Sequence, residues 1–501
     1  MESFTRVTRI DNVPLNEVFL WHTREGAFER LNPPWQQFTV IERKGSVENN
    51  GVVKIRMVGI GPLQMKWVVK HFDYIEGKQF RDVQVSGLFS SWTHNHLFES
   101  LGSSSCQLQD HIEYSLPGGL LGGIIARNLV NKKLQKIFDY RHRITGQDIR
   151  NHHLVIHKVM KNNKPLTIAI TGSSGFIGSS LIPFLTTGGH KVIRLLRRRP
   201  NPDESTASVQ SIQWNPSSSD SIGLPSSTIA YDDNNNHPII NAVVNLAGEN
   251  VFGRWTKEKK KRILESRVNT TRSLCKALAS LDKPPKVLVS ASATGYYGNR
   301  DNEILTEDSS TSSSSTAAPS PNSSSNSFSV DFLSDVSSQW EQATQVAKEA
   351  GIRVVNLRIG VVLSASGGIL AKILSPFNIG FGGKIGNGNQ YISWIALDDL
   401  LGIILQAIAD ESLVGTVNAV APNPVTNSDF TKILGKVLSR PTIFSIPKFI
   451  IRAVLGEELA DSVILSSTRV LPTRLTETSR YQFRFPYLEE ALRHTLGKNM
   501  V

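Results

Sequence analysis

The stretch at residues 171–178, TGSSGFIG, constrains the fold of this chain more than any other. It follows the short apolar run 166–170, which predicts a buried strand, and it opens the apolar run 176–185, which predicts a helix. Its three glycines allow a tight turn, a close approach of the backbone to a pyrophosphate, and close packing of helix on strand. The alternative is a glycine turn without a ligand. We predict a dinucleotide site made of seven consecutive residues: Gly172, Ser173, Ser174, Gly175, Phe176, Ile177 and Gly178.

After this turn, predicted strands alternate with predicted helices. Such an order is typical of an α/β fold in which a parallel, doubly wound sheet is covered on both faces, the Rossmann architecture. The second strand, 191–196, runs into the basic phrase RLLRRR at 194–199, with no acid to hold a ribose 2′-hydroxyl. The guanidinium groups of Arg197 and Arg198 suit a 2′-phosphate, so we predict NADP(H) as the cofactor. A solvated basic turn is the alternative.

Later phrases resemble those of the short-chain dehydrogenase/reductase family. The GxxGxxG spacing is similar to that family's variant of the dinucleotide fingerprint. The predicted strand 239–246 ends in Asn-Leu-Ala-Gly, which resembles the family's turn beneath adenine and ribose, and the predicted helix 256–281 carries an Asn-Thr-Thr-Arg phrase at 269–272. In the family, this asparagine helps to set the geometry of the active site. The resemblance adds four residues to the predicted cofactor site: Asn245, Ala247, Gly248 and Asn269.

The predicted strand 286–290 leads into the phrase SASATGYYG at 290–298. In the extended branch of the family, this strand end supplies a Ser or Thr that hydrogen-bonds the reacting oxygen of the substrate. The resemblance therefore implies Ser292, Thr294 and Tyr297 as catalytic residues, with Tyr296 as a further candidate. It also implies that Arg358 or Asp398 faces the substrate.

The same resemblance leads us to expect a tyrosine followed four residues later by a lysine, which together serve as general acid or base. Counting back from Trp340 places the tyrosine near 332–333 and the lysine near 336–337, where the sequence has Phe-Leu and Val-Ser. Neither phenylalanine nor leucine exchanges a proton. Ordinary dehydrogenase chemistry therefore lacks its usual acid, and we leave open whether the chain is an enzyme.

Four phrases point to one branch of this family, the nucleoside-diphosphate-sugar epimerase-like proteins. They are GRW at 253–255, SATGYYG at 292–298, GGIL at 367–370 and LP-x-RL at 471–475. The resemblance covers residues 166–495 and implies a Rossmann domain at 166–429 followed by a small DUF1731-like domain at 430–495. Members of this branch typically lack the Tyr and Lys, so activity is an implication of the fold.

Residues 1–150 predict a separate α+β domain. Six short segments rich in Val, Ile, Phe and Trp between 38 and 114 predict an antiparallel sheet, with two short helices at 14–31 and a long helix at 120–143. This order resembles the helix-grip fold of the SRPBCC (START-like, polyketide-cyclase-like) superfamily. The resemblance implies an apolar cavity for a hydrophobic ligand, and a filled structural core is the alternative.

His94 and His96 lie two residues apart on a predicted strand and therefore share one face of the sheet. A metal pair is one interpretation, but no third ligand lies nearby in the sequence, so we favour a polar sheet face and predict no metal. We interpret Asp110, His111 and Glu113 as sheet surface in the same way.

Three polar stretches are predicted to lie outside the domain cores. Residues 145–164 contain His152, His153 and His157; we interpret them as a solvated connection, with the linker proper at 151–165, and not as a metal site. Residues 308–329 are almost entirely Ser, Thr, Pro, Asn and Ala, which predicts a disordered insertion. The Ser- and Asn-rich stretch 217–238 is predicted to be a surface loop.

The composition, with 501 residues and a hydrophobic content of 40%, is typical of a globular protein of two or three domains. The net charge is +12, but its cations are scattered among acids, so we expect no nucleic-acid partner. Two distant cysteines predict a reducing compartment, and we expect no transmembrane segment and no signal peptide. The expected location is the cytoplasm, with plastid association as the alternative.

Two classes of function fit these observations. The first is an NADP(H)-dependent oxidoreductase or nucleotide-sugar epimerase of unknown substrate, with a hydrophobic ligand in the N-terminal domain. The second is a non-catalytic, NADPH-sensing regulator or scaffold, for example in plastid or cell division. A weaker third is a carrier whose Rossmann part modifies apolar cargo held by residues 1–150.

Overall fold

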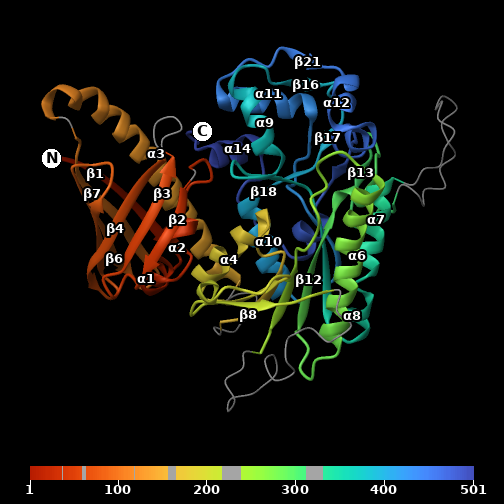
Figure 1. Cartoon of the computed structure of the whole chain (residues 1–501), viewed down its shortest axis with the longest axis horizontal. Helices are drawn as coiled ribbons and strands as arrows, with labels where there is room; N and C mark the ends of the chain where they lie inside the picture. Colours follow the sequence, from red (N-terminus) through yellow and green to blue (C-terminus); the bar gives the residue numbers. More distant parts are fainter. Residues whose placement is uncertain are drawn as a thin grey trace. The chain divides into compact units, whose positions relative to one another are not determined.

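The computed structural model describes residues 1–36, 38–58, 64–117, 119–155, 165–216, 239–311 and 331–500. The chain forms two compact units (Figure 1). The first comprises Met1–Asn163, Pro183–Gly189 and Arg493–Val501, and the second comprises Lys164–Ile182 and His190–Leu492. The predicted loop 217–238 and, beyond residue 311, the predicted insertion 308–329 lie outside the described residues. None of the helices in the described part of the chain combines the length and apolar character needed to cross a bilayer.

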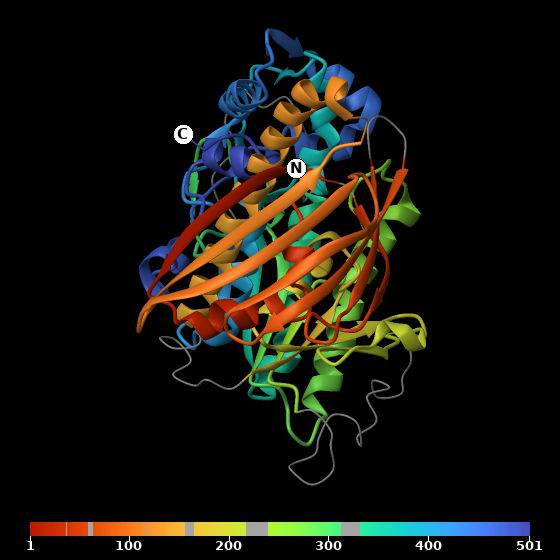
Figure 2. The same cartoon turned by 90° about the vertical axis from the view of Figure 1, so that its left-hand side faces the viewer.

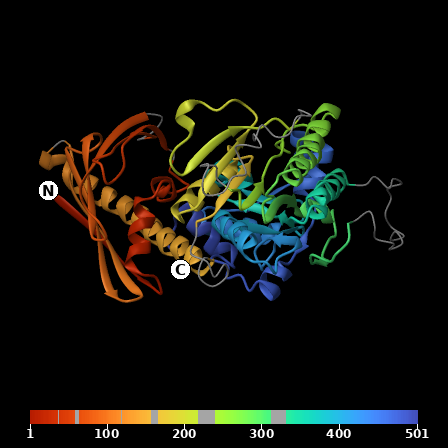
Figure 3. The ribbon, with the colours of Figure 1, turned by 90° about the horizontal axis from the view of Figure 1, so that it is seen from below.

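The first unit is an antiparallel sheet with one long helix. Its seven strands are ordered β1-β7-β6-β5-β4-β3-β2, and helix α3 runs along one face of this sheet (Figures 2 and 3). The predicted fold is confirmed here. The elements are β1 (Glu2–Asp11), α1 (Leu15–Thr23), α2 (Ala27–Arg30), β2 (Phe38–Lys44), β3 (Val52–Val58), β4 (Gln64–Ile75), β5 (Gln79–Ser86), β6 (Ser91–Gly102), β7 (Ser105–Ser115) and α3 (Gly119–Leu154).

Strict alternation along β6 and β7 creates the inward face of this sheet. Every second residue is buried from Trp92 to Phe98 in β6 and from Cys106 to Tyr114 in β7, because successive side chains of a strand point to opposite faces. Leu134 and Phe138 of α3 pack on Trp92, Ile112 and Tyr114 of that face. The helix therefore covers the apolar side of the sheet, and the space between helix and sheet holds a packed core.

Helix α3 is longer than the sequence led us to expect. It continues through Leu154, so the first part of the predicted connection 145–164 is helical. Thr145 and Asp148 are fully buried, and Asp148 forms an ion pair of 2.7 Å with buried Arg30. The interpretation of these polar residues as solvated was wrong, because a partner on α2 lets a carboxylate lie inside. His152 is also buried, with Nε2 at 2.9 Å from the Phe184 carbonyl, whereas His157 lies outside the described residues.

The second unit contains the predicted parallel sheet, ordered β10-β9-β8-β11-β12-β14-β19. All its neighbouring strands are parallel, and helices lie on both sides of it (Figure 1). The Rossmann prediction is confirmed. Up to the last strand the elements are β8 (Thr167–Thr171), α4 (Phe176–Thr187), β9 (Lys191–Leu196), η2 (Pro202–Glu204), β10 (Val209–Gln213), β11 (Ala242–Asn245), α6 (Lys257–Ala279), β12 (Val287–Ala293), η3 (Thr294–Tyr297), β13 (Ile304–Leu305), α7 (Phe332–Gln342), α8 (Gln345–Glu349), β14 (Arg353–Ile359), β15 (Val361–Leu363), α9 (Gly368–Asn378), β16 (Gly383–Ile385), β17 (Tyr391–Ile392), β18 (Trp394–Ala396), α10 (Leu397–Ala409) and β19 (Gly415–Ala419).

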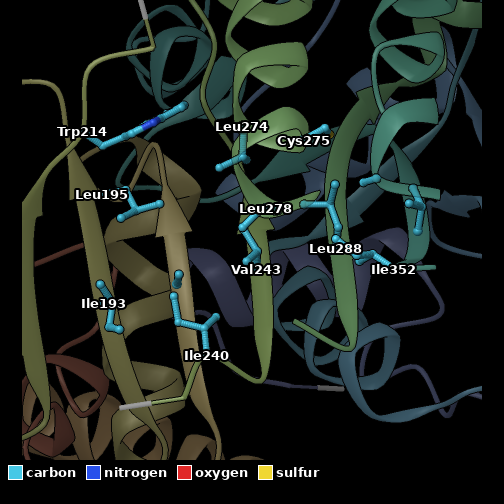
Figure 4. Close-up of a cluster of buried hydrophobic side chains, with 13 residues drawn as sticks. Ile193, Leu195, Trp214, Ile240, Val243, Leu274, Cys275, Leu278, Leu288 and Ile352 are labelled. Atoms are coloured by element: carbon cyan, nitrogen blue, oxygen red, sulfur yellow. The ribbon is translucent and has the colours of Figure 1, made fainter. Parts of the chain in front are cut away.

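One core cluster fixes the position of helix α6 on this sheet. Leu274, Cys275 and Leu278 of α6 belong to the same buried cluster as Val243 of β11 and Leu288 of β12 (Figure 4). These apolar residues of α6 recur at intervals of three and four, which places them on one side of the helix. The opposite side of α6 therefore faces away from the core.

The chain after β19 adds small elements to the second unit. Short two-stranded pairings join it to earlier segments, as in β13 with β22 and β16 with β21. The elements are β20 (Val425–Thr426), α11 (Asn427–Leu438), β21 (Phe444–Ile446), α12 (Lys448–Leu455), α13 (Glu457–Leu459), η5 (Ala460–Ile464), β22 (Arg469–Val470), η6 (Arg474–Thr478) and α14 (Leu488–Leu496).

Candidate functional site

The strand order of the second unit creates a crevice between β8 and β11. The chain leaves β8 toward β9 and β10 on one side, then returns to β11, β12, β14 and β19 on the other. At such a reversal the loops that follow the two central strands diverge, and ligands of open α/β sheets bind outside the carboxyl ends of these strands. The glycine loop follows β8, and the Asn-Leu-Ala-Gly turn follows β11. Both predicted cofactor segments therefore lie at this crevice.

Two glycines of the loop are required by close backbone contacts. Gly172 has φ of +66°, and a Cβ there would lie 2.5 Å from the Leu246 carbonyl oxygen. A Cβ on Gly178 would collide with the carbonyl oxygen of Gly172. Gly175 is exposed, and a Cβ there would meet only that same oxygen, at 3.2 Å. The first and third glycines thus allow the turn to form, and the second leaves the outer surface of the loop open.

The loop leads directly into the N-terminus of α4, where the first-turn N–H groups have no partner within the helix. Ser173 is 2% exposed, and its Oγ is a buried polar atom without a hydrogen-bond partner. Ser174 is exposed, and Phe176 and Ile177 are half-buried. Unpaired donors and the positive end of the helix dipole suit a pyrophosphate, so the residues present fit a dinucleotide.

The two predicted arginines after β9 differ in their surroundings. Both are exposed, but Arg198 forms a two-point ion pair with Glu204 of η2, and this pairing lowers the pKa of Glu204 to about 2. Among the described residues, Arg197 forms no hydrogen bond or ion pair. Its guanidinium is therefore available to an anion beyond the end of β9, whereas that of Arg198 is already occupied.

Asn245 holds the ends of the central strands together through its side chain. Its Oδ1 accepts from Thr171 Oγ1 at 2.7 Å, and its Nδ2 donates to Thr271 Oγ1 at 2.8 Å and to Ser290 Oγ at 3.1 Å. Asn245 is fully buried, so its amide supports the crevice from behind. In the same turn Ala247 donates its backbone N–H to Thr171 Oγ1 at 3.3 Å, and Gly248 is exposed. A dinucleotide would contact this turn through Gly248 and the loop surface.

Asn269 lies on the exposed face of α6, which differs from the role implied by the family resemblance. Two residues farther on, Thr271 is fully buried, and its Oγ1 accepts from Trp340 Nε1 at 2.9 Å. Two helical residues differ by about 200° around the axis, so they face opposite ways. Arg267 lies on the inner side, stacked 5.2 Å from the Trp340 ring and close to Gly248, and burial lowers the pKa of Arg267 to about 10. Neither Arg267 nor Thr271 was among the site residues predicted from the sequence.

Ser292 belongs to a closed set of buried polar side chains, which we call the Arg358 network: Ser292, Tyr297, Glu341, Arg358 and Asn418. Ser292 Oγ donates to Glu341 Oε1 at 2.6 Å. Arg358 Nε and Nη2 each donate to one oxygen of the same carboxylate at 2.8 Å. Burial alone would lower the pKa of Arg358, but the Glu341 carboxylate outweighs it and raises that pKa. Arg358 is 3% exposed and fully engaged, so the expectation that it faces a substrate was wrong.

Tyr297 completes this network and lies behind the crevice. Its hydroxyl donates to Asn418 Oδ1 at 2.7 Å and accepts from Arg358 Nη1 at 3.0 Å. The side chain has no exposed surface, and burial raises the pKa of Tyr297 to about 12 despite the nearby guanidinium. The Tyr297 hydroxyl is therefore engaged within the Arg358 network, and its side chain offers no surface to a ligand. Thr294 and Tyr296 are both half-buried in η3, and the Tyr296 ring lies 3.3 Å from the Arg358 guanidinium.

Comparison with known proteins agrees with this geometry. The sequence pattern of the NAD dependent epimerase/dehydratase family matches residues 168–419, and the domain of unknown function DUF1731 matches 446–495. The chain belongs to this epimerase family. It is therefore an NAD(P)-binding protein, as the glycine loop led us to expect. Both matched segments fall within the part for which the sequence analysis recognised the family.

Three relatives of this epimerase-family chain show how far the likeness extends. Epimerase family protein Mb2239 of Mycobacterium bovis is 36% identical over 328 residues, which are 65% of this chain and 96% of the relative. The crystal structure of a nucleoside-diphosphate sugar epimerase from Corynebacterium glutamicum has a TM-score of 0.75 at 32% identity, covering 99% of this chain and 90% of that one. The structure of human epimerase family protein SDR39U1 (isoform 2) with NADPH has a TM-score of 0.55 at 31% identity, covering 66% and 99%.

The position at which a catalytic tyrosine was expected in this epimerase-family chain is apolar in the structure as well. Leu333 of α7 approaches Gly295 of η3, with its Cβ 3.3 Å from the place of a Cβ there. Four residues farther on, Ser337 is buried in the expected lysine position. Phe332 packs its ring against Trp255 at 5.1 Å. None of these side chains supplies an acid at the crevice.

Asp398 and Asp399 begin helix α10 and are both largely buried. Asp399 accepts hydrogen bonds from the backbone N–H groups of Arg484 at 2.7 Å and Phe485 at 3.0 Å. Burial raises the pKa of Asp399 to about 6, although these donors act in the opposite direction. Asp399 therefore anchors the C-terminal segment, and the expected substrate contact of Asp398 stays a prediction.

The interpretation of His94, His96 and Asp110 as a polar sheet surface was wrong. All three side chains are buried on the inward face of the first unit, at 3%, 7% and 4% exposure. Trp92 and Phe98 lie an even number of residues from the two histidines on β6, so all four side chains point to the same face of the sheet. The two apolar residues identify that face as the core side. Burial lowers the pKa of His94, but Asp82 and Asp110 outweigh it and raise the pKa to about 9. His111 and Glu113 lie half-buried on the other face, as expected.

Proposed function

We propose that this chain binds NADP(H) in the crevice between β8 and β11 and uses it to reduce a carbonyl group or oxidise the corresponding alcohol. The observation that carries the proposal is that two features occur together. One is the open glycine loop, and the other is Arg197, an exposed arginine that forms no ion pair among the described residues. A guanidinium at the end of the second strand binds a 2′-phosphate and gains nothing from a free 2′-hydroxyl. A relative has been crystallised with NADPH, which supports the same preference.

The residues that we propose to hold the cofactor lie in the segments that follow β8 and β9. The N-terminus of α4, with Ser173 and Ser174, would bind the pyrophosphate, and Arg197 would bind the 2′-phosphate. When bound, NADPH supplies a hydride for an electrophilic carbon. Arg198 contributes less than Arg197, because it would first have to leave Glu204.

On the substrate side, Thr294 and Tyr296 are the hydroxyl groups that could reach a reacting oxygen. Both are partly exposed in η3, directly after β12, whereas Ser292 and Tyr297 are turned into the Arg358 network. In the reducing direction, the carbon gains a hydride and its oxygen takes a proton, so one group must donate that proton. We assign the donation to the Tyr296 phenol, with Thr294 holding the oxygen by a hydrogen bond.

A panel of aldehydes, ketones and sugar nucleotides would test this activity through the oxidation of NADPH. Gly175→Asp is the matched negative control, because it places a carboxylate where the pyrophosphate would lie, at an exposed position where the new Cβ meets one backbone oxygen at 3.2 Å. We expect turnover by the wild type and none by Gly175→Asp. Tyr296→Phe should lower kcat more than Tyr297→Phe. Equal rates for the wild type and Gly175→Asp on every compound would reject an NADPH-dependent reaction.

The second candidate function is an NADPH-sensing regulator or scaffold without chemistry of its own. It is favoured by Leu333 and Ser337, which occupy the expected positions of the catalytic pair. This function predicts that NADPH binds, that Gly175→Asp abolishes binding, and that no compound is reduced. Limited proteolysis with and without NADPH would then reveal the change in conformation that a sensor needs, and an identical digestion pattern would exclude it. The hydrophobic ligand expected in the first unit stays a prediction, tested by lipid analysis of the purified chain.

A further inference from the structure

The first unit contains a second polar centre, which the family does not explain. We call it the histidine–aspartate cluster: Asp82, His94, His96, Asp110 and His142. Three adjacent strands bring four of these residues together, because Asp82 on β5 stands opposite His94 on β6, and His96 stands opposite Asp110 on β7. His142 reaches the same place from α3. Each of the five residues is at most 9% exposed.

Asp110 orients the histidines from one side. Its Oδ1 accepts from His94 Nε2 at 2.9 Å, and its Oδ2 accepts from His142 Nε2 at 2.7 Å. His96 Nδ1 lies 2.7 Å from Oδ1, but without the alignment of a hydrogen bond. A carboxylate that receives ring N–H groups fixes the tautomer and leaves the opposite ring nitrogen with a free lone pair. This arrangement is typical of the groups that surround metal-bound histidines.

The opposite ring nitrogens converge on Asp82. His94 Nδ1 and His96 Nε2 lie 3.2 and 3.5 Å from the same oxygen, Asp82 Oδ2. Neither contact is aligned as a hydrogen bond, and both are longer than the 2.7–2.9 Å of a charge-assisted one. Atoms bound to one metal ion at about 2.0–2.2 Å lie about 3.0–3.6 Å apart in tetrahedral or octahedral geometry. The donor atoms of all three residues lie within 4.8 Å of one another.

We propose that His94 Nδ1, His96 Nε2 and Asp82 bind one divalent transition-metal ion inside the first unit. Two imidazoles and one carboxylate are ligands suited to Zn²⁺ and Fe²⁺. Three protein ligands leave at least one coordination position for water or for an oxygen atom of a ligand. Asp110, which accepts from His94 Nε2, acts as the orienting carboxylate behind His94.

The charges around the cluster favour a bound cation. Asp82 and Asp110 are two buried carboxylates, and half-buried Arg141 lies near enough to interact with both. Arg141 balances one negative charge and leaves the other for a metal ion or for a proton on His94. A proton on His94 is therefore the alternative to a bound metal ion. The poor alignment of His94 Nδ1 with Asp82 favours the metal, since a proton there would lack a linear acceptor.

Titration of the full chain with Zn²⁺ after removal of metals by a chelator tests the proposal. We expect one Zn²⁺ per chain by calorimetry, and visible absorption when Co²⁺ replaces it. Asp82→Asn and His96→Gln should abolish this binding, and Asp110→Asn should weaken it about 10–100-fold. His111→Gln is the matched control, because His111 lies on the outward face of β7 and should bind metal as the wild type does.

Circular dichroism verifies that each variant is folded. A folded wild type that binds no Zn²⁺ would overturn the proposal and leave a proton on His94 as the balancing charge. Binding that is unchanged in folded Asp82→Asn and His96→Gln would also overturn it, because the ion would then lie elsewhere on the chain. If one variant fails to fold, the other decides, and His94→Gln serves as a third.

Discussion

The two buried polar centres of this chain differ in how completely their atoms are paired. In the Arg358 network, both oxygens of Glu341 accept hydrogen bonds from Arg358, and the Tyr297 hydroxyl both donates and accepts. In the histidine–aspartate cluster, Nδ1 of His96 and Nδ1 of His142 are buried without hydrogen-bond partners. A buried polar atom without a partner costs free energy unless something binds to it.

This difference separates a scaffold from a binding site. The Arg358 network ties β12, α7 and β14 together through hydrogen bonds between its own side chains, and Tyr297 connects it to η3. In the histidine–aspartate cluster, two other ring nitrogens, His94 Nδ1 and His96 Nε2, lie 3.2 and 3.5 Å from one Asp82 oxygen, and these are the atoms that we propose bind an ion. Incomplete pairing, rather than the presence of charged residues, distinguishes the proposed metal site from the Arg358 network.

The largest loss of stability is expected for Arg358→Met, which removes the cation of the Arg358 network. It leaves the Glu341 carboxylate largely buried without its cation, and we expect the second unit to lose about 3–5 kcal/mol of stability. Urea unfolding followed by circular dichroism measures the loss. Arg262→Met is the control, because Arg262 is exposed and 3.9 Å from its acidic partner, so its loss should stay below about 1 kcal/mol. Similar losses in the two variants would show that the Arg358 network is not a unit of stability.

Asp399 is a third buried carboxylate, which accepts hydrogen bonds from the backbone N–H groups of Arg484 and Phe485. Its pKa of about 6 lies above the unfolded value of 3.8, so the folded chain takes up a proton first as the pH falls. Stability of the wild type relative to Asp399→Asn should therefore rise between pH 7 and pH 4, by up to about 3 kcal/mol. Urea unfolding of both proteins at several pH values measures it, and a constant difference would contradict the raised pKa.

Thr271 and Asn269 compare a buried, hydrogen-bonded side chain with an exposed one on the opposite face of the same helix. Thr271→Val removes the acceptor for both Asn245 Nδ2 and Trp340 Nε1 and should cost about 1–3 kcal/mol. Asn269→Ala should change stability by less than about 0.5 kcal/mol, because Asn269 is exposed. Thermal unfolding of both variants measures this difference in stability. Equal losses in the two variants would contradict the orientation of α6.

The glycine loop could be predicted because its requirements are local. The turn, the strand before it and the helix after it are consecutive in the sequence, and the need for glycine at 172 and 178 arises from contacts made by that turn. The missing tyrosine–lysine pair was predicted for the same reason, since α7 places positions four residues apart on one face.

The histidine–aspartate cluster depends on pairing between distant segments, which the sequence does not display. Asp82, His94 and Asp110 meet only when β5, β6 and β7 pair in one register. The face of the sheet on which the histidines lie could nevertheless be predicted from Trp92 and Phe98, which occupy alternate positions of the same strand. The same reasoning applies to α6, where Thr271 shares the buried stripe of Leu274 and Leu278, and Asn269 does not. For these side chains, the alternation of apolar residues along the strand or helix was therefore a better guide to burial than the family resemblance of the surrounding residues.

The most direct test of the proposed cofactor site is the ratio of the NADH to the NADPH dissociation constant, measured by calorimetric titration for the wild type and Arg197→Ala. We expect the wild type to prefer NADPH strongly. Arg197→Ala should lose about 1–3 kcal/mol of NADPH binding, about 5–150-fold, with NADH unaffected. Arg198→Ala should lose less, because Arg198 pairs with Glu204, and exposed Arg199→Ala should match the wild type. Equal binding of both cofactors, or an unchanged ratio in Arg197→Ala, would contradict the proposed recognition of the 2′-phosphate.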